Sequence, residues 1–279
     1  MAEVWLAYDD VMGREVAIRV PRTADMKLRM EQESKFLGRL NHPNIMDVHD
    51  FRKEGALAYM VCEYLDGQTV EDRLKAAISS GGVMQEAEIV LVAAAVLDGL
   101  VVIHSKGFVH RDIKPSNIMC LLESKVLSVK IMDFGIAKSM REEDNSVRTT
   151  TGADWGSRAY MSPSAKEGEL DTRNDLWAVG ITMLECALNR VPKKLATTAA
   201  VPVEEMRERD YTEPFIRVVA KALNKDIEKG FQSAGEMLAK VRELTKQKTG
   251  QTTIKKNLQQ MQQQMQQLRQ GQQQIQLNQ

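Results

Sequence analysis

The stretch His110-Arg111-Asp112-Ile113-Lys114-Pro115-Ser116-Asn117 decides the fold of this chain, together with Asp133-Phe134-Gly135, which begins sixteen residues after Asn117. Asp112 and Asp133 offer carboxylates, Lys114 an ammonium group and Asn117 an amide. Carboxylate and amide oxygens are the ligands that a hard cation such as Mg²⁺ prefers. Each motif alone could arise by chance, but the two in this order and at this spacing form a strong signal.

The two motifs resemble those of the eukaryotic-type (Hanks-type) protein kinases. The segments His104-Ser105-Lys106-Gly107-Phe108-Val109 and Met161-Ser162-Pro163, on either side of them, are similar to the bacterial serine/threonine branch. The resemblance covers residues 1–245. It implies an α+β fold of two lobes, with a small β-rich N-lobe carrying one helix (residues 1–64) and a large α-rich C-lobe (residues 65–245).

The resemblance also implies an activity, which is transfer of the γ-phosphate of ATP to serine and threonine hydroxyls of proteins. Catalysis of this reaction depends mostly on positioning and on neutralising the charge of the phosphates. Asp112 would accept the hydroxyl proton, and Lys114 would lie beside the γ-phosphate. Asn117 and Asp133 would hold Mg²⁺. The expected catalytic residues are Asp112, Lys114, Asn117 and Asp133, together with Arg19 and Glu33.

The nucleotide pocket would be built mainly from the N-lobe. Glu33 lies where the family places the glutamate of its N-lobe helix, and Arg19 stands at the position of the nucleotide-binding lysine. Cys62 falls at the gatekeeper position, just before the hinge. The expected nucleotide-binding residues are Val4 and Ala17 above the adenine, Met119 below it, the hinge backbone at Glu63 and Leu65, and Arg19 and Cys62.

Other residues match supporting positions of the family. Asp175 corresponds to the aspartate that anchors the catalytic loop, although alone it would be interpreted as a helix N-cap. Ser157 takes the place of the hydroxyl residue that contacts Asp112. Thr149–Thr151 are candidates for phosphorylation facing Arg111, but such clusters are also usual in any exposed loop. The stacked hydrophobic spine would consist of Leu37, Val48, His110 and Phe134.

The chain also departs from the family pattern in three places. Met1-Ala2-Glu3-Val4 resembles only the end of the glycine-rich loop, so the first strand and most of that loop would be missing and the next strand would become a sheet edge. Either the gene truly starts here, or Met1 is a mis-assigned internal methionine or the boundary of a fragment. We favour the second interpretation. Arg19 replaces a lysine, and Arg and Lys are not equivalent. We therefore expect weak ATP binding and strongly reduced catalysis.

The third departure concerns a buried ion pair. Ser164 replaces the glutamate that closes the activation segment, and Gly230 replaces its arginine partner. Loss of both partners avoids the cost of leaving one charge buried alone. We expect a looser substrate-binding segment as a result.

Periodicity supports the same organisation. Alternating apolar residues predict strands over 15–20 and 58–62, and helical patterns predict helices over 26–40, 70–78, 86–105 and 174–188. Residues 246–279 form a Gln-rich, low-complexity tail. Its apolar residues from Ile254 to Ile275 follow heptad a/d spacing, so two interpretations stay open: a short coiled coil that pairs chains, or a solvated helix.

The composition of the chain excludes several classes of protein. The 279 residues carry 38 basic and 38 acidic side chains, and this balance argues against a protein held to nucleic acid mainly by phosphate contacts. The longest apolar run, 89–97, is shorter than a membrane span. Three scattered cysteines predict no disulfide framework. We therefore expect a cytoplasmic protein without a membrane segment.

Function remains divided between two main classes. The first is a serine/threonine kinase that uses ATP and Mg²⁺ on protein substrates. The second is a pseudokinase that acts as a nucleotide-binding or scaffolding module, which Arg19 and the missing loop favour. Retention of Asp112, Asn117 and Asp133 favours the enzyme. A small-molecule phosphotransferase is a weaker third alternative, because Lys114 points to a polypeptide substrate.

Overall fold

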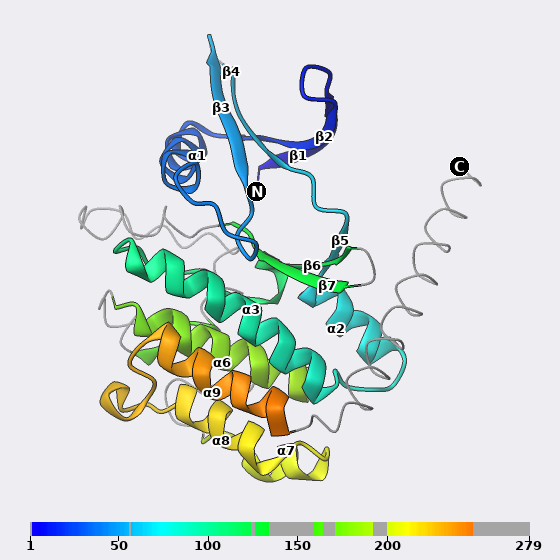
Figure 1. The fold of residues 1–279 in the computed structure, drawn as a ribbon, viewed down its shortest axis with the longest axis vertical. Coiled ribbons are helices and arrows are strands. Elements are labelled where there is room, and N and C mark those ends of the chain that lie inside the picture. The colour runs from blue at the N-terminus through cyan, green and yellow to red at the C-terminus, as the bar shows by residue number, and fades with distance from the viewer. Residues whose placement is uncertain are drawn as a thin grey trace.

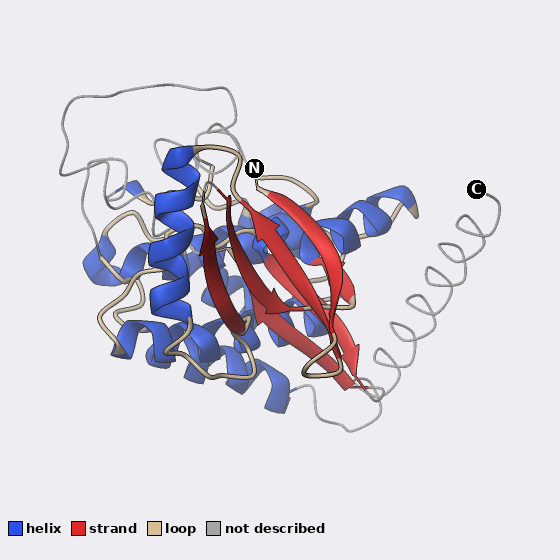
Figure 2. Ribbon diagram, turned by 90° about the horizontal axis from the view of Figure 1, so that it is seen from above, coloured by secondary structure: helices blue, strands red, loops and turns tan. Residues whose placement is uncertain are grey.

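The computed structural model describes residues 2–55, 57–123, 126–133, 159–163, 171–191 and 200–247. Within them, a small lobe of strands with one helix lies above a larger lobe of helices (Figure 1). Seen from above, the strands lie over the helical lobe (Figure 2). The expected two-lobed architecture is therefore present.

The N-lobe is built on an antiparallel sheet of four strands in the order β1-β2-β4-β3. Val16 faces the core on β2, and Ala58, Met60 and Cys62 alternate inward on β4, as period-two patterning requires. In the described part of the chain, β1 forms one edge of the sheet and pairs only with β2. The strands are β1 (Glu3–Asp9), β2 (Arg14–Val20), β3 (Val48–Glu54) and β4 (Leu57–Glu63).

One helix, α1 (Ala24–Leu37), packs on β3 and β4. Thr23 caps its N-terminus, because its hydroxyl accepts a hydrogen bond from the N–H of Met26 at 3.2 Å. Gly38 follows the last residue of the helix. The buried side of α1 includes Glu33, so the helix delivers a carboxylate to the interior of the lobe.

A second antiparallel sheet, in the order β5-β6-β7, lies at the junction of the lobes. The segment after α1 is bonded to it: the N–H of Met46 donates to the carbonyl of Ile131, and the N–H of Ile131 donates to the carbonyl of Asn44. The position of α1 is thereby tied to the strand that leads into Asp133. The strands are β5 (Gly67–Thr69), β6 (Ile118–Glu123) and β7 (Val126–Ile131).

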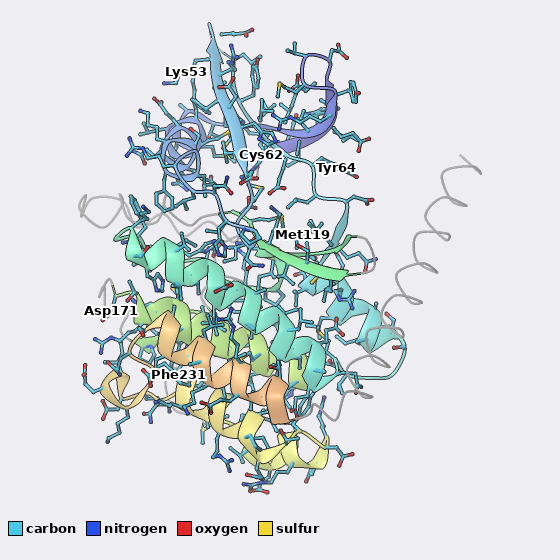
Figure 3. The ribbon with its side chains drawn as sticks, viewed as in Figure 1. Lys53, Cys62, Tyr64, Met119, Asp171 and Phe231 are labelled. Carbon is cyan, nitrogen blue, oxygen red and sulfur yellow. The ribbon has the colours of Figure 1, made fainter. Side chains whose placement is uncertain are left out.

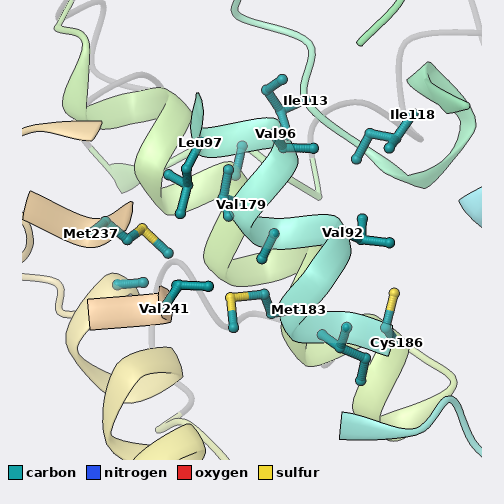
Figure 4. Packing of buried hydrophobic residues seen from close by; sticks show 14 of the residues in the cluster. Val92, Val96, Leu97, Ile113, Ile118, Val179, Met183, Cys186, Met237 and Val241 are labelled. Atoms are coloured by element: carbon teal, nitrogen blue, oxygen red, sulfur yellow. The ribbon is translucent and has the colours of Figure 1, made fainter. Parts of the chain in front are cut away.

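The C-lobe is a stack of helices around α3 and α6. Figure 4 shows Val92, Val96 and Leu97 meeting Val179 and Met183, with Met237 and Val241 closing the other side. The apolar faces of three helices thus form the main core. The helices are α2 (Val70–Ser79), α3 (Glu86–Ser105), η1 (Pro115–Asn117), α6 (Arg173–Leu188), α7 (Val203–Glu208), α8 (Glu213–Ala222), η4 (Ile227–Lys229) and α9 (Ala234–Gln247).

Helix α3 bears on the expected absence of a membrane segment. It has the 20 residues predicted over 86–105, and among the described helices it is the one long and apolar enough to span a bilayer. Half of its most apolar window is buried in the fold. A core helix passes the same test, so the finding is weak support for a membrane span.

Several expectations concern residues outside those described. These are the Gln-rich tail with its coiled-coil alternative, apart from the end of α9, and the residues Phe134, Gly135, Thr149–Thr151, Ser157 and Ser164. Gly230 lies within the described residues. It follows the last residue of η4 and lines a pocket together with Pro163 and Trp177.

Candidate active site

The loop 110–117 is anchored by Asp175, which is 1% exposed in the first turn of α6. Its carboxylate accepts the backbone N–H groups of His110 and Arg111, each at 2.8 Å, and Oδ2 lies 2.8 Å from Nε2 of His104. Arg111 has φ 66°, which is outside helix and strand geometry. The two N–H groups therefore cannot form the backbone hydrogen bonds of a helix or sheet and need another acceptor. Asp175 therefore fixes the backbone that carries Asp112, as expected.

The His110 ring connects this loop to the residue before Asp133. The N–H of Asp112 donates to Nδ1 at 3.3 Å, and Nε2 lies 3.2 Å from the carbonyl of Met132. Because Nδ1 accepts, a neutral ring carries its proton on Nε2 and donates it to Met132. Burial lowers the pKa of His110, which favours this neutral form.

Asp112, Lys114 and Asn117 form one polar cluster. Lys114 Nζ lies 2.8 Å from Asp112 Oδ2, and Asn117 Nδ2 donates to the same oxygen at 2.9 Å and to the Asp112 carbonyl at 2.8 Å. The single turn η1 folds Asn117 back toward Asp112. A carboxylate held by two donors suits a fixed acceptor for a substrate proton, and the nearby ammonium suits an anionic group.

Asp133 completes this side of the site. Asn117 Nδ2 lies 3.5 Å from the Asp133 carbonyl, so the two residues are neighbours. The nitrogen of the Asn117 side-chain amide faces Asp112, so the amide oxygen is the atom left to bind a cation. The Asp133 side chain is 49% exposed, so a cation can also reach its carboxylate. One carboxylate and one amide oxygen fit Mg²⁺ bound partly by phosphate oxygens. Within the described ranges, no cluster of three or more His, Cys, Asp or Glu could hold a metal by itself.

Arg19 joins the two lobes through two carboxylates. Its Nη2 lies 2.7 Å from Asp133 Oδ1, and its Nη1 lies 3.3 Å from Glu33 Oε1. Burial alone would lower the pKa of Arg19, but the charges of Asp133 and Glu33 outweigh it and raise the pKa. Both Arg19 and Glu33 were expected site residues, and their contact and the bond to Asp133 are additions from the structure.

The predicted adenine-binding residues gather at the lobe junction. Ala17 and Leu65 pack against a small cluster that includes Cys62, which is fully buried. Figure 3 shows Cys62 and Tyr64 above the sheet at the junction, and Met119 at that sheet. Burial raises the pKa of the Cys62 thiol to about 12, so the thiol stays neutral.

Val4 is the outlying member of the predicted set. It pairs with Arg19 across β1 and β2, so the two residues share a sheet face. Val4 is 64% exposed, whereas Ala17 is half-buried. Val4 is therefore open to solvent, whereas the other predicted N-lobe residues of this set are at least half-buried.

Two positioning residues were missed in the sequence. Lys130, on β7, places Nζ 2.7 Å from Oε1 of hinge residue Glu63, which also accepts the N–H of Asp47 at 2.7 Å. His104 supports Asp175, as described above. A lone lysine in a strand and a histidine near a helix end carry no sequence signal, because their partners are 67 and 71 residues away.

The segment 159–163 packs against α6. Tyr160 donates a hydrogen bond to Glu185, and Ser162 donates one to Asn174. Burial raises the pKa of Glu185 and that of the Tyr160 hydroxyl. These contacts attach the end of the expected substrate-binding segment to the helix that also anchors the catalytic loop.

Comparison with known proteins agrees with this geometry. The sequence profile described as "Protein kinase domain" matches residues 1–276. The chain belongs to the protein kinase family. Within the matched domain, the loop 110–117 carries Asp112, Lys114 and Asn117, and Cys62 lies directly before Glu63.

Its relatives place the kinase in the bacterial serine/threonine branch. It is 35% identical over 259 residues to the serine/threonine-protein kinase PknB of Mycolicibacterium smegmatis, covering 86% of this chain and 40% of PknB. It is 33% identical over 256 residues to the probable serine/threonine-protein kinase SCO3848 of Streptomyces coelicolor, covering 85% and 37%. The chain thus spans about two-fifths of the length of these relatives.

Solved structures share the fold. The kinase domain of PknI from Mycobacterium tuberculosis superposes with a TM-score of 0.66 at 22% identity, covering 87% of this chain and 91% of that one. Rad53 residues 1–466 in complex with AMP-PNP superposes with a TM-score of 0.67 at 22% identity, covering 85% and 60%. Both likenesses concern the fold alone.

Proposed function

We propose that this chain is a protein serine/threonine kinase that transfers the γ-phosphate of ATP to hydroxyl groups of protein substrates. The observation that carries the proposal is the cluster in which Lys114 and Asn117 hold the Asp112 carboxylate at 2.8 Å and 2.9 Å. Asp175 fixes the backbone beneath this cluster, so its geometry does not depend on bound substrate.

Each residue of the cluster has a role in the proposed reaction. Asp112 accepts the proton of the substrate hydroxyl as that oxygen attacks the γ-phosphorus. Lys114 stabilises charge on the transferred phosphoryl group. Asn117 and Asp133 would hold Mg²⁺, which supplies further neutralisation of the phosphates when bound. Arg19 supplies positive charge from the opposite lobe.

Phosphate transfer to a generic acceptor protein tests this proposal. The full chain, incubated with labelled ATP and Mg²⁺, should place label on serine and threonine, as read by phosphoamino-acid analysis. Asp112→Asn should abolish the label, whereas Asp98→Asn, the same change at a distant pair with Arg242, should not. Label on tyrosine only, or label unaffected by Asp112→Asn, would contradict the proposal.

One observation favours the alternative of a pseudokinase. Arg19 lies 2.7 Å from Asp133, so the carboxylate expected to bind metal already has a cationic partner. A pseudokinase would show a thermal shift on adding ATP but no transfer under any metal condition. Turnover that depends on Asp112 would exclude this alternative.

We propose a cytoplasmic setting for this domain. Support comes from Cys62, Cys120 and Cys186, which are all free and buried, as in proteins of reducing compartments. Protein substrates are the proposed partners. Fractionation of cells expressing the chain would test the setting, and recovery of the domain outside the cytoplasm would overturn it.

A further inference from the structure

The two terminal nitrogens of Arg19 form ion pairs that differ in their exposure to solvent. The Glu33 end is enclosed: the side chains of Arg19 and Glu33 are 15% and 10% exposed. The Asp133 end is open to solvent, because the Asp133 side chain is 49% exposed. Water screens an ion pair that is partly exposed, and a ligand can reach it, so the Asp133 contact is the one that can be exchanged.

The guanidinium shape makes such an exchange workable. Its two terminal nitrogens act separately here, with Nη1 toward Glu33 and Nη2 toward Asp133. A lysine would offer a single nitrogen at this position. Arg19 can therefore stay attached to α1 while its other nitrogen releases Asp133.

We propose that Arg19 is the resident counter-ion of Asp133, and that a divalent cation binding this carboxylate competes with the Nη2 end of the guanidinium. The inference rests on the proposed function, because it assumes that Asp133 is a metal ligand. It adds a competition between a side chain and the metal that sets the cation requirement of this kinase. By linkage, metal at Asp133 loosens Arg19, and its freed Nη2 becomes available to an anionic phosphate.

Competition between Arg19 and a divalent cation for Asp133 should change the apparent cation affinity by a measurable factor. Apparent affinity for a ligand falls in proportion to the fraction of molecules whose site is free. A partly exposed ion pair reduces that fraction roughly fivefold. Removing the guanidinium should therefore tighten divalent-cation binding roughly fivefold.

Binding of Mn²⁺ alone to the full chain, followed by the electron paramagnetic resonance signal of the free ion, tests the inference without any catalytic readout. Arg19→Met should bind Mn²⁺ roughly fivefold more tightly than the wild type, and Arg19→Lys should lie between them. Glu33→Gln should act in the opposite direction, because the guanidinium then loses its second carboxylate and holds Asp133 more firmly. Arg22→Met, which removes an exposed arginine paired with Glu3, is the matched control and should leave the affinity unchanged.

Asp133→Asn identifies the bound ion, since it should remove the tight Mn²⁺ site of Arg19→Met. Equal affinity in the wild type, Arg19→Met and Arg19→Lys, with Asp133-dependent binding intact, would overturn the inference and leave the proposed function standing. Shifts of Arg19→Met and Glu33→Gln in the same direction would also overturn it, because general loosening of the site produces that pattern. Absence of Asp133-dependent binding in every variant would overturn both the inference and the proposed metal site.

Discussion

At the scale of single residues, the candidate site is held by hydrogen bonds and ion pairs, some between neighbours in sequence and some between distant residues. Sequence motifs predicted the positions of Asp112, Lys114 and Asn117, because the residues of a short loop stay close in the fold. They did not predict that Arg19 bridges Glu33 and Asp133, residues 14 and 114 positions away along the chain. That contact depends on how the two lobes meet, which local sequence does not specify.

His110 gives a prediction about pH. Burial lowers its pKa in the folded state, so the unfolded chain binds more protons as pH falls below the ordinary histidine value of about 6.5. Stability from the neutral ring is therefore present above about pH 6.5 and is lost as pH falls from there. His49, whose pKa is lowered by burial and by Arg14, contributes to the same slope.

The measurement is the melting temperature of the wild type and of His110→Phe between pH 7.5 and pH 5. The variant should be less stable at neutral pH but should lose less stability on acidification, by at most about 1.4 kcal/mol per pH unit. Parallel curves for the two proteins would show that His110 contributes no proton linkage.

At the scale of elements, helix and strand positions were predictable where apolar periodicity was strong. The helix patterns over 70–78, 86–105 and 174–188 match α2, α3 and α6 to within about one residue. The helix expected over 26–40 occupies Ala24–Leu37, because Thr23 caps it and Gly38 follows it. Ties between elements were not predictable, since each joins residues that are distant in sequence.

The tie between β7 and the hinge provides a prediction for this scale. Lys130→Met removes the ammonium group that pairs with Glu63 and leaves the mostly buried Glu63 carboxylate without this ion pair. The free energy of unfolding should therefore fall by about 1–3 kcal/mol. Urea denaturation measures it. In a double variant with Glu63→Gln, the loss should be smaller than the sum of the single losses.

Lys53→Met is the matched control, because it removes an exposed lysine paired with Glu31 and should change stability by less than about 0.5 kcal/mol. Additive losses for Lys130 and Glu63 would mean that the pair is not coupled.

At the scale of the whole molecule, the sequence predicted a sheet-rich lobe followed by a helix-rich lobe, and the structure has both. The packing of the C-lobe could not be predicted, because α7, α8 and α9 carry no catalytic motif and their contacts are with α3, α6 and one another. Close approach of α6 and α8 depends on Gly180: a Cβ there would lie 2.8 Å from Ala222 Cβ and 3.0 Å from Leu223 Cδ2.

Paired glycine substitutions test this packing. Gly180→Ala should destabilise the fold by about 1–3 kcal/mol, because the added methyl group forces the helices apart. In Gly235→Ala, in the first turn of α9, the added Cβ meets only Ser233 Oγ at 3.9 Å, so the change should stabilise by about 0.4–1 kcal/mol by lowering the conformational entropy of the unfolded chain. Thermal unfolding should show a lower melting temperature for Gly180→Ala and a higher one for Gly235→Ala. A higher melting temperature for both variants would contradict the close approach of α6 and α8.

Phosphate transfer by the Asp112 cluster is tested by the intact mass of the full chain before and after incubation with ATP and a large excess of Mg²⁺, measured beside Asp112→Asn. We expect the wild type to gain the mass of one or more phosphoryl groups and Asp112→Asn to gain none. An unchanged wild-type mass, or an equal gain in both proteins, would contradict the assignment of Asp112 and its cluster as the centre of phosphate transfer.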